Sequence, residues 1–101
     1  MNNKEFLGKI KVLDDNTRLT ILQMLSKNGT MCACKILEEL SITQATLSYH
    51  MKVLSNAGFV SVVRDGKWCH YTLLNEKICE IAQFIQNICL CKANSKERCC
   101  K

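Results

Sequence analysis

The chain has 101 residues, enough for one small domain; 48% of them are apolar and none is proline. Its formal net charge of +5 suits a polyanionic partner such as DNA, although charge alone does not identify one. The first residues are charged and no apolar run approaches the ~18 residues of a membrane span, so we expect a cytoplasmic protein with no membrane partner. In that reducing compartment, eight cysteines indicate metal ligands or reactive thiols rather than structural disulfides.

Apolar residues at helical spacing predict four helices in the first half of the chain. We expect them at residues 3–13, from the sequence DDNT to Asn28-Gly29, at about 32–40 and at about 44–56, with a tight turn at SIT between the last two. The residues predicted to face the core are Leu19, Ile21, Leu22, Met24, Leu25, Ile36, Leu37, Leu40, Ile42, Leu47, Met51 and Leu54.

After Gly58 the pattern changes to β-branched and aromatic residues. Asp65-Gly66 interrupts them and is typical of a type I′ turn, which predicts a hairpin with strands at 59–64 and 67–74. A last helix, at about 76–89, carries an apolar stripe from Ile78 to Ile88. We therefore predict a mainly α fold with a small β-hairpin, in the order ααααββα. A short helix, a turn, a second helix and a β wing define a winged helix-turn-helix.

The helix after the turn has an outer face suited to reading DNA. Glutamine pairs with adenine, serine and threonine reach bases or phosphates, and alanine contacts the thymine methyl group. The hairpin tip adds cations that would lie on the phosphate backbone. The predicted DNA-binding residues are Thr43, Gln44, Ala45, Thr46, Ser48, Tyr49 and Lys52 of the helix, with Arg64 and Lys67 of the wing.

Three segments, LDDNTRLTILQMLSKNG, ATLSYHMKVLSNAGFV and RDGKWCHYTL, resemble the ArsR/SmtB family of metal-responsive winged-helix repressors. The resemblance covers residues 13–74. It implies a repressor, not an enzyme, that binds palindromic operator DNA as a homodimer paired through its first and last helices. On this basis residues 1–91 form the DNA-binding and dimerisation domain, and residues 92–101 form a cysteine-rich tail. His50 and His70 match scaffold and wing positions, so we expect structural or DNA-proximal roles for them.

The motif CACKIL resembles the arsenite sensors of this family, which places Cys32 and Cys34 as the metal-binding pair. Those sensors often carry a third cysteine at the position that Leu37 occupies here. Trivalent arsenic and antimony are thiophilic and three-coordinate, so As(III) or Sb(III) is the expected effector, and no catalytic cofactor is expected. The candidates for the third ligand are Cys89, Cys91, Cys99 and Cys100. Alternatively, Cys91, Cys99 and Cys100 form a separate site in the tail.

Residues two apart on a helix point about 200° away from each other. Cys32 and Cys34 open the predicted helix, so their sulfur atoms should diverge, and its first turn must unwind or rotate before they share an ion. This predicts that metal binding distorts the helix that leads into the recognition helix and so releases the operator. We interpret Cys69 and Cys79 as small apolar side chains.

Three other readings stay open. A Cd(II) or Pb(II) sensor would use the same cysteine pair, but related sensors add cysteines from an N-terminal arm that this chain lacks. A thiol redox switch would oxidise the paired cysteines on the same scaffold. A thiol oxidoreductase or a metal chaperone is disfavoured, because the chain contains no CxxC motif and no acid–base partner beside a nucleophile.

Overall fold

Residues 1–89, which the computed structural model describes, form five helices and three strands. The order is α1 (Asn3–Leu13), α2 (Asn16–Asn28), β1 (Met31–Cys32), α3 (Ala33–Glu39), α4 (Gln44–Asn56), β2 (Val60–Asp65), β3 (Trp68–Leu73) and α5 (Asn75–Ile88). The predicted winged helix-turn-helix is confirmed, and α1 and α4 begin and end at the predicted residues. The strand β1 was not predicted. The proposed tail, 92–101, lies outside the described residues.

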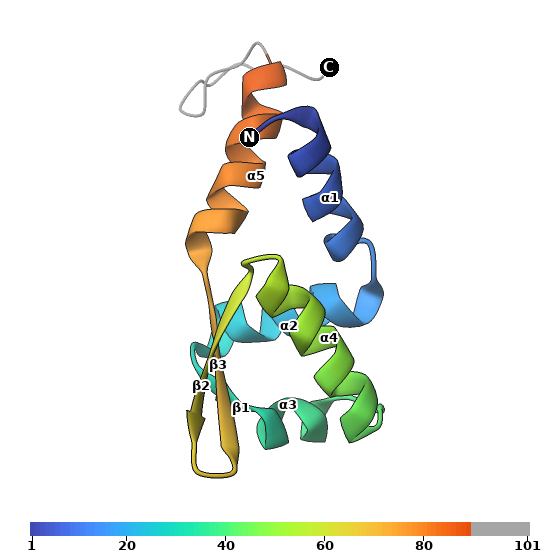
Figure 1. Cartoon of the computed structure of the whole chain (residues 1–101), viewed down its shortest axis with the longest axis vertical. Coiled ribbons are helices and arrows are strands. Elements are labelled where there is room, and N and C mark those ends of the chain that lie inside the picture. The colour runs from blue at the N-terminus through green and yellow to red at the C-terminus, as the bar shows by residue number, and fades with distance from the viewer. Residues whose placement is uncertain (90–101) are drawn as a thin grey trace.

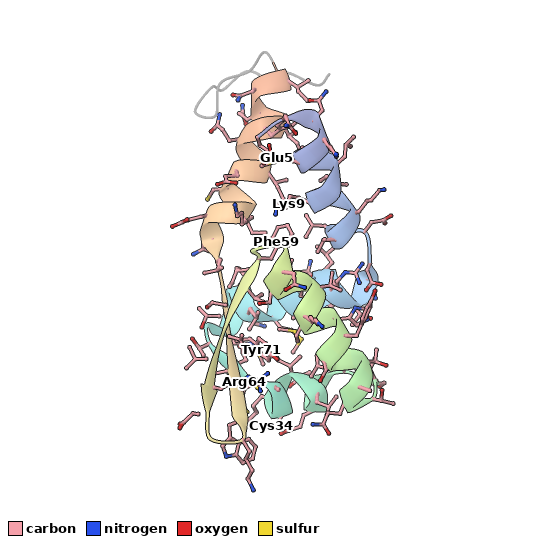
Figure 2. The ribbon with its side chains drawn as sticks, in the orientation of Figure 1. Glu5, Lys9, Cys34, Phe59, Arg64 and Tyr71 are labelled. Carbon is pink, nitrogen blue, oxygen red and sulfur yellow. The ribbon has the colours of Figure 1, made fainter. Side chains whose placement is uncertain are left out.

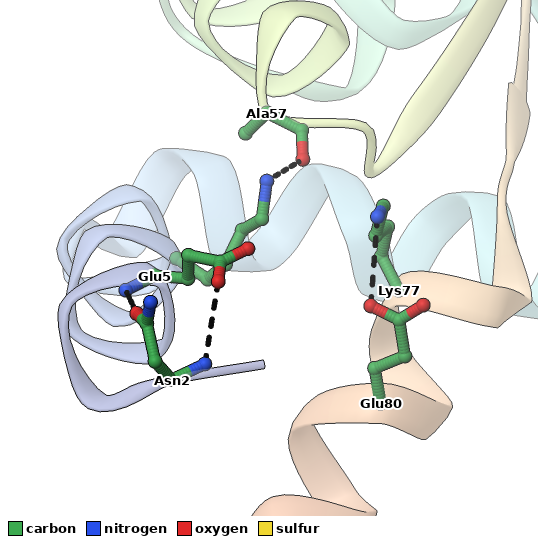
Figure 3. Close-up of polar contacts among 6 residues, drawn as sticks. Asn2, Glu5, Ala57, Lys77 and Glu80 are labelled. Carbon is green, nitrogen blue, oxygen red and sulfur yellow. Dashed lines mark hydrogen bonds and ion pairs between the residues drawn. The ribbon is translucent and has the colours of Figure 1, made fainter.

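Side-chain caps explain where the helices begin. Asn2 and Glu5 form a reciprocal capping box on α1, with hydrogen bonds of 2.8 and 3.3 Å between each side chain and the other residue's backbone N–H (Figure 3). Asp15, within the predicted DDNT signal, accepts a hydrogen bond of 3.0 Å from the backbone N–H of Arg18 and starts α2. This hydrogen bond lowers the pKa of the Asp15 carboxyl group.

The three strands form one antiparallel sheet in the order β1-β3-β2. The short strand β1 pairs Met31 with Tyr71 and Cys32 with His70. A two-residue turn, Gly66-Lys67, joins β2 to β3. Gly66 has φ of 64°, whereas no described residue other than glycine has a positive φ. The predicted type I′ turn is therefore wrong, because a positive φ at the first central position alone is the pattern of type II′.

The core lies where α2, α3 and α4 meet the base of the hairpin, and Phe59 marks the point at which the hairpin leaves the helices (Figure 2). The predicted burial of Leu22 and Leu25 is confirmed. Leu19 was predicted to be buried but is 44% exposed, while Ile21 is fully buried. Relative to a stripe centred on Leu19, Leu22 and Leu25, α2 is rotated about its axis so that Ile21, Leu22 and Leu25 face the core. The buried apolar residues are Ile21, Leu22, Leu25, Ile36, Leu47, Met51, Leu54, Phe59, Val60 and Ile81.

The molecule is elongated, 48 × 28 × 24 Å, with α1 and α5 together at one end and α3 and the hairpin tip at the other (Figure 1). The rings of Phe6 and Phe84 stack at 4.1 Å and hold α1 against α5. The Lys9 ammonium donates a 2.6 Å hydrogen bond to the Ala57 carbonyl oxygen and so links α1 to the end of α4 (Figure 3). No helix within residues 1–89 combines the length and the apolar character needed to traverse a bilayer.

Candidate functional site: an exposed helix, a basic groove and a thiol pair

The helix α4 buries one face and exposes the other. Leu47, Met51 and Leu54 recur at helical spacing and pack in the core. The predicted DNA-binding residues of this helix occupy the opposite face, and each of them is exposed: Gln44, Ala45, Thr46, Ser48, Tyr49 and Lys52. This face is therefore exposed to solvent from Gln44 to Lys52.

Thr43 also has a structural role. It is the N-cap of α4, and its hydroxyl oxygen accepts a 3.1 Å hydrogen bond from the backbone N–H of Thr46. The hydroxyl groups of Thr43 and Thr46 are also 2.9 Å apart and hydrogen-bonded. Both threonines are exposed, but their hydroxyl groups are already used to start the helix.

A groove of about 570 Å³ runs between α4 and the hairpin. Lys52 lines it from the helix, and Arg64 and Lys67 line it from the wing. Figure 2 shows Arg64 on the hairpin beside the helices. Three cations along one groove, with Gln44 and Ser48 in its wall, form a surface suited to a phosphate backbone that follows the groove.

His50 lies beneath this surface, 8% exposed, on the buried side of α4. Its Nδ1 atom is 3.1 Å from Nη1 of Arg18. A guanidinium group only donates hydrogen bonds, so Nδ1 of His50 is the acceptor. Arg18 also donates a 2.7 Å hydrogen bond to the carbonyl oxygen of Val12. The geometry thus ties His50 to the scaffold, where it joins α2 to α4.

The sulfur atoms of Cys32 and Cys34 converge. Cys32 is the last residue of β1 and the N-cap of α3, with extended backbone angles (φ −72°, ψ 146°), and only Cys34 lies in the helix. The Cys34 thiol donates a hydrogen bond of 3.0 Å to the Cys32 sulfur. The expectation that the sulfurs diverge is wrong, because it placed both residues in the helix. Two sulfurs bound to one ion at about 2.3 Å, the zinc–thiolate bond length, lie roughly 3.5 Å apart. The pair needs little change to share an ion.

The same hydrogen bond makes the two thiols unequal. Donation from Cys34 lowers the pKa of the Cys32 thiol, and the partnership with Cys32 raises the pKa of the Cys34 thiol. The pair therefore loses its protons in two steps, the first of them from a sulfur already stabilised as a thiolate. Cys32 is therefore the thiol of the pair that ionises first.

The thiol pair borders a second cavity, of about 290 Å³, enclosed by α3, α4 and the hairpin. Leu37 and Gln44 line it from the helices, and Trp68 and Cys69 line it from the wing. Cys69 was expected to be a small apolar side chain, and its position on this cavity was not predicted. The position of Cys69 depends on β1, which pairs with β3 and so brings the start of α3 against the wing. A strand of two residues shows no periodicity, so it cannot be recognised in the sequence.

Of the four cysteines predicted as third ligands, only Cys89 is among the residues that the structure describes. Cys89 follows directly after α5, whereas Cys91, Cys99 and Cys100 lie outside the described residues. Within residues 1–89, no group of three His, Cys, Asp or Glu side chains is arranged to hold a metal ion. Cys79 is exposed on α5 rather than packed as an apolar filler.

An exposed helix after a tight turn, with a basic wing beside it, defines a winged-helix DNA-binding protein. A family model described as "Bacterial regulatory protein, arsR family" matches residues 15–62. The chain is 38% identical to the arsenical resistance operon repressor of Staphylococcus aureus over 101 aligned residues. The alignment covers 100% of this chain and 93% of that repressor. The chain belongs to the ArsR family of transcriptional regulators.

Two further likenesses extend the comparison. A cadmium resistance transcriptional regulatory protein CadC homolog of Staphylococcus aureus is 32% identical over 73 residues, which are 72% of this chain and 60% of that protein. An ArsR-like transcriptional regulator from Rhodococcus sp. RHA1 superposes with a TM-score of 0.74, at 24% identity, over 84% of this chain and 79% of its own. This last likeness concerns the fold alone.

Proposed function

We propose that this chain is a cytoplasmic repressor that binds operator DNA as a homodimer and releases it when As(III) or Sb(III) binds the thiolates of Cys32 and Cys34. Reading of the operator is assigned to the exposed face of α4, and contact with its phosphates to the wing cations Arg64 and Lys67. The likeness to an arsenical resistance operon repressor over the whole chain supports this effector class.

The observation that carries the proposal is the 3.0 Å approach of the two sulfurs at the head of α3. Soft trivalent ions prefer thiolate ligands, and here two of them already converge. The cavity beside the pair is also lined by Gln44 and Ser48 of α4. Binding at the pair therefore acts on a space that the recognition helix shares. Release requires that the ion bind more tightly to the DNA-free conformation.

Two other effectors keep specific support. The likeness to a CadC homolog favours Cd(II), which also takes thiolate ligands. The close sulfurs favour oxidation to a Cys32–Cys34 disulfide by a peroxide or a disulfide oxidant. Counting free thiols before and after mild oxidation, together with operator binding, separates a redox switch from a metal sensor.

The test is an operator titration with the full chain, its thiols kept reduced, against arsenite, antimonite, cadmium, lead and zinc. We expect arsenite or antimonite to weaken operator binding by about 5–150-fold, the usual range of allosteric coupling. A Cys32→Ser/Cys34→Ser variant should bind the operator and ignore arsenite. The control Cys79→Ser, at an exposed site on α5, should respond as the native chain does. Release of the double variant by arsenite at the native concentration would contradict the assignment of the pair.

A further inference from the structure

Three thiols line the cavity between α3, α4 and the hairpin. Cys32 and Cys34 approach it from the head of α3, and Cys69 approaches it from β3. Figure 2 shows Cys34 at the base of the molecule, beside the hairpin that carries Arg64 and Tyr71. Leu37 also lines the cavity. The arsenite sensors that this chain resembles often have their third cysteine at this position, but here it is leucine and supplies no sulfur. The wing is thus a source of a third sulfur.

The register of the sheet directs Cys69 toward the helices. Cys69 and Tyr71 are two residues apart on β3, so their side chains lie on the same face of the strand. Tyr71 packs against the core, which identifies that face as the inner one. The neighbouring residue, His70, pairs with Cys32 of β1. Cys69 is therefore one residue from the position that pairs with Cys32, but the side chain of Cys32 lies on the same face as His70, opposite to that of Cys69. Because β1 ends at Cys32, the two sulfurs can meet around the end of this strand once the wing twists toward α3.

The Cys69 sulfur has a cation beside it. Arg64, directly opposite Cys69 in the β2–β3 ladder, donates a hydrogen bond of 3.4 Å from Nη1 to this sulfur. A thiolate bound to a metal ion keeps part of its negative charge, and a guanidinium group at hydrogen-bonding distance compensates that charge. An apolar filler at this position would not use such a partner.

We propose that Cys69 is the third thiolate of the soft-metal site, and that the bound ion draws the wing onto the head of α3. This inference rests on the proposed function. No three potential ligands within residues 1–89 are close enough in the structure to hold an ion, so the hairpin must move toward α3 when the site fills. The reaction with arsenous acid is a ligand exchange: three As–O bonds break, three As–S bonds form, and each hydroxide leaves as water with one thiol proton. Nothing is oxidised or reduced.

The hairpin is built to allow this movement. Its base is held by the buried Phe59 and Val60 and by the pairing of β3 with β1 as far as His70, whereas the tip beyond this pairing is exposed on β2 from Val62 to Asp65. A free tip on a fixed base bends at low cost, because few buried contacts are broken. The movement displaces Arg64 and Lys67, the wing cations assigned to phosphate contacts. Metal binding then weakens DNA binding through the wing, without unwinding α3.

Trp68, the single tryptophan of the chain, lines the same cavity and reports on it directly. The experiment is a fluorescence titration of the reduced full chain with arsenite, combined with X-ray absorption at the arsenic edge to count bound sulfurs. For the native chain we expect a saturable change in Trp68 emission and three sulfurs per arsenic. Cys69→Ser should leave two sulfurs, abolish the emission change and weaken binding by more than roughly tenfold, since even outer-sphere substitutions cost about 10–100-fold.

Matched variants separate the possible failures. Cys79→Ser should titrate as the native chain does, and Cys69→Ala must behave as Cys69→Ser does if loss of the sulfur is the cause. Far-UV circular dichroism and thermal unfolding establish that both Cys69 variants fold. If they retain three sulfurs and native affinity while Cys99→Ser/Cys100→Ser loses a sulfur, the third ligand comes from the tail and this inference is overturned. If the native chain binds no arsenite at all, the proposed function fails first.

Discussion

At the scale of single residues, the arrangement of the thiol pair depends on one change of backbone conformation. Cys32 is extended and Cys34 is helical, so the boundary between β1 and α3 falls between the two sulfurs and turns them toward each other. The hydrogen bond between them lowers the pKa of Cys32 and raises that of Cys34. The number of protons that the pair carries at a given pH therefore decides how the affinity for each effector changes with pH.

The two effector classes should differ in the sign of that response. Cd(II) displaces protons from thiols, so its affinity rises with pH, by about tenfold per unit for each proton released. From the pair, two protons leave below the lowered pKa of Cys32, and one leaves between the pKa values of Cys32 and Cys34. Arsenous acid supplies a hydroxide for every thiol proton, so its affinity should stay level until the first thiol ionises and fall above that pH.

Competition titrations of both ions across the neutral range measure these slopes. In the variant Cys34→Ala, Cys32 loses its side-chain hydrogen-bond donor, and the break in the cadmium slope should move to higher pH. An arsenite affinity that rises steeply with pH would contradict the ligand-exchange reaction.

At the scale of elements, α4 and the hairpin act as one surface. The helix presents short polar side chains, and the wing adds Arg64 and Lys67 beside Lys52 along a shared groove. Phosphate contacts provide affinity that depends on salt, whereas base contacts provide sequence preference. Substitutions in the two elements should therefore be distinguishable by how they change the salt dependence.

We expect Arg64→Ala and Lys67→Ala each to weaken operator binding similarly for matched and mismatched sequences. Each substitution removes one phosphate contact per protomer, so in a dimer the slope of log K against log salt should fall by about 1.8, at about 0.9 per contact. Gln44→Ala should instead leave the slope unchanged and reduce discrimination, by about 1–3 kcal/mol per base pair read.

Fluorescence anisotropy of a labelled duplex at several salt concentrations measures both effects. Lys4→Ala is the matched control, because Lys4 is an exposed cation on α1, at the end of the molecule away from the hairpin (Figure 1). An equal loss of slope in this control would show that net charge, not the wing, sets the salt dependence.

At the scale of the whole molecule, the end formed by α1 and α5 exposes apolar side chains. Leu7 is 56% exposed, Ile85 51% and Ile88 73%. Clustered apolar side chains that stay exposed on a small domain mark surfaces for association. This supports the proposed homodimer through the first and last helices, since both helices bring apolar residues to one end. It also leaves the opposite end, with α4 and the wing, free for DNA.

Leu7→Glu/Ile85→Glu should convert the dimer to a monomer, because the charges would be buried without partners in the interface. The single chain should stay folded, since both side chains are exposed in it. Analytical ultracentrifugation gives the mass, and operator binding should fall with it. The control Val63→Glu changes an equally exposed apolar residue, at 63%, on the hairpin, and should remain dimeric. A dimeric double variant would place the interface elsewhere.

The sequence by itself determined the helices, the cap that starts α2, and the wing. These depend on local patterns: apolar residues at helical spacing, Asp15 within the cap signal DDNT, and a glycine at the hairpin turn. It also determined which face of α4 stays exposed, because Leu47, Met51 and Leu54 use up the other face. The family followed from the same segments.

Only the tertiary structure decided how the thiols are arranged. The strand β1 is two residues long, and its hydrogen bonds go to β3, some 40 residues along the chain, so no local pattern announces it. That pairing holds Cys32 extended, brings its sulfur to Cys34 and places Cys69 on the same cavity. Likewise, the rotation that buries Ile21 and exposes Leu19 depends on packing against other elements. Contacts between distant segments are set by packing, which residue spacing along one helix does not encode.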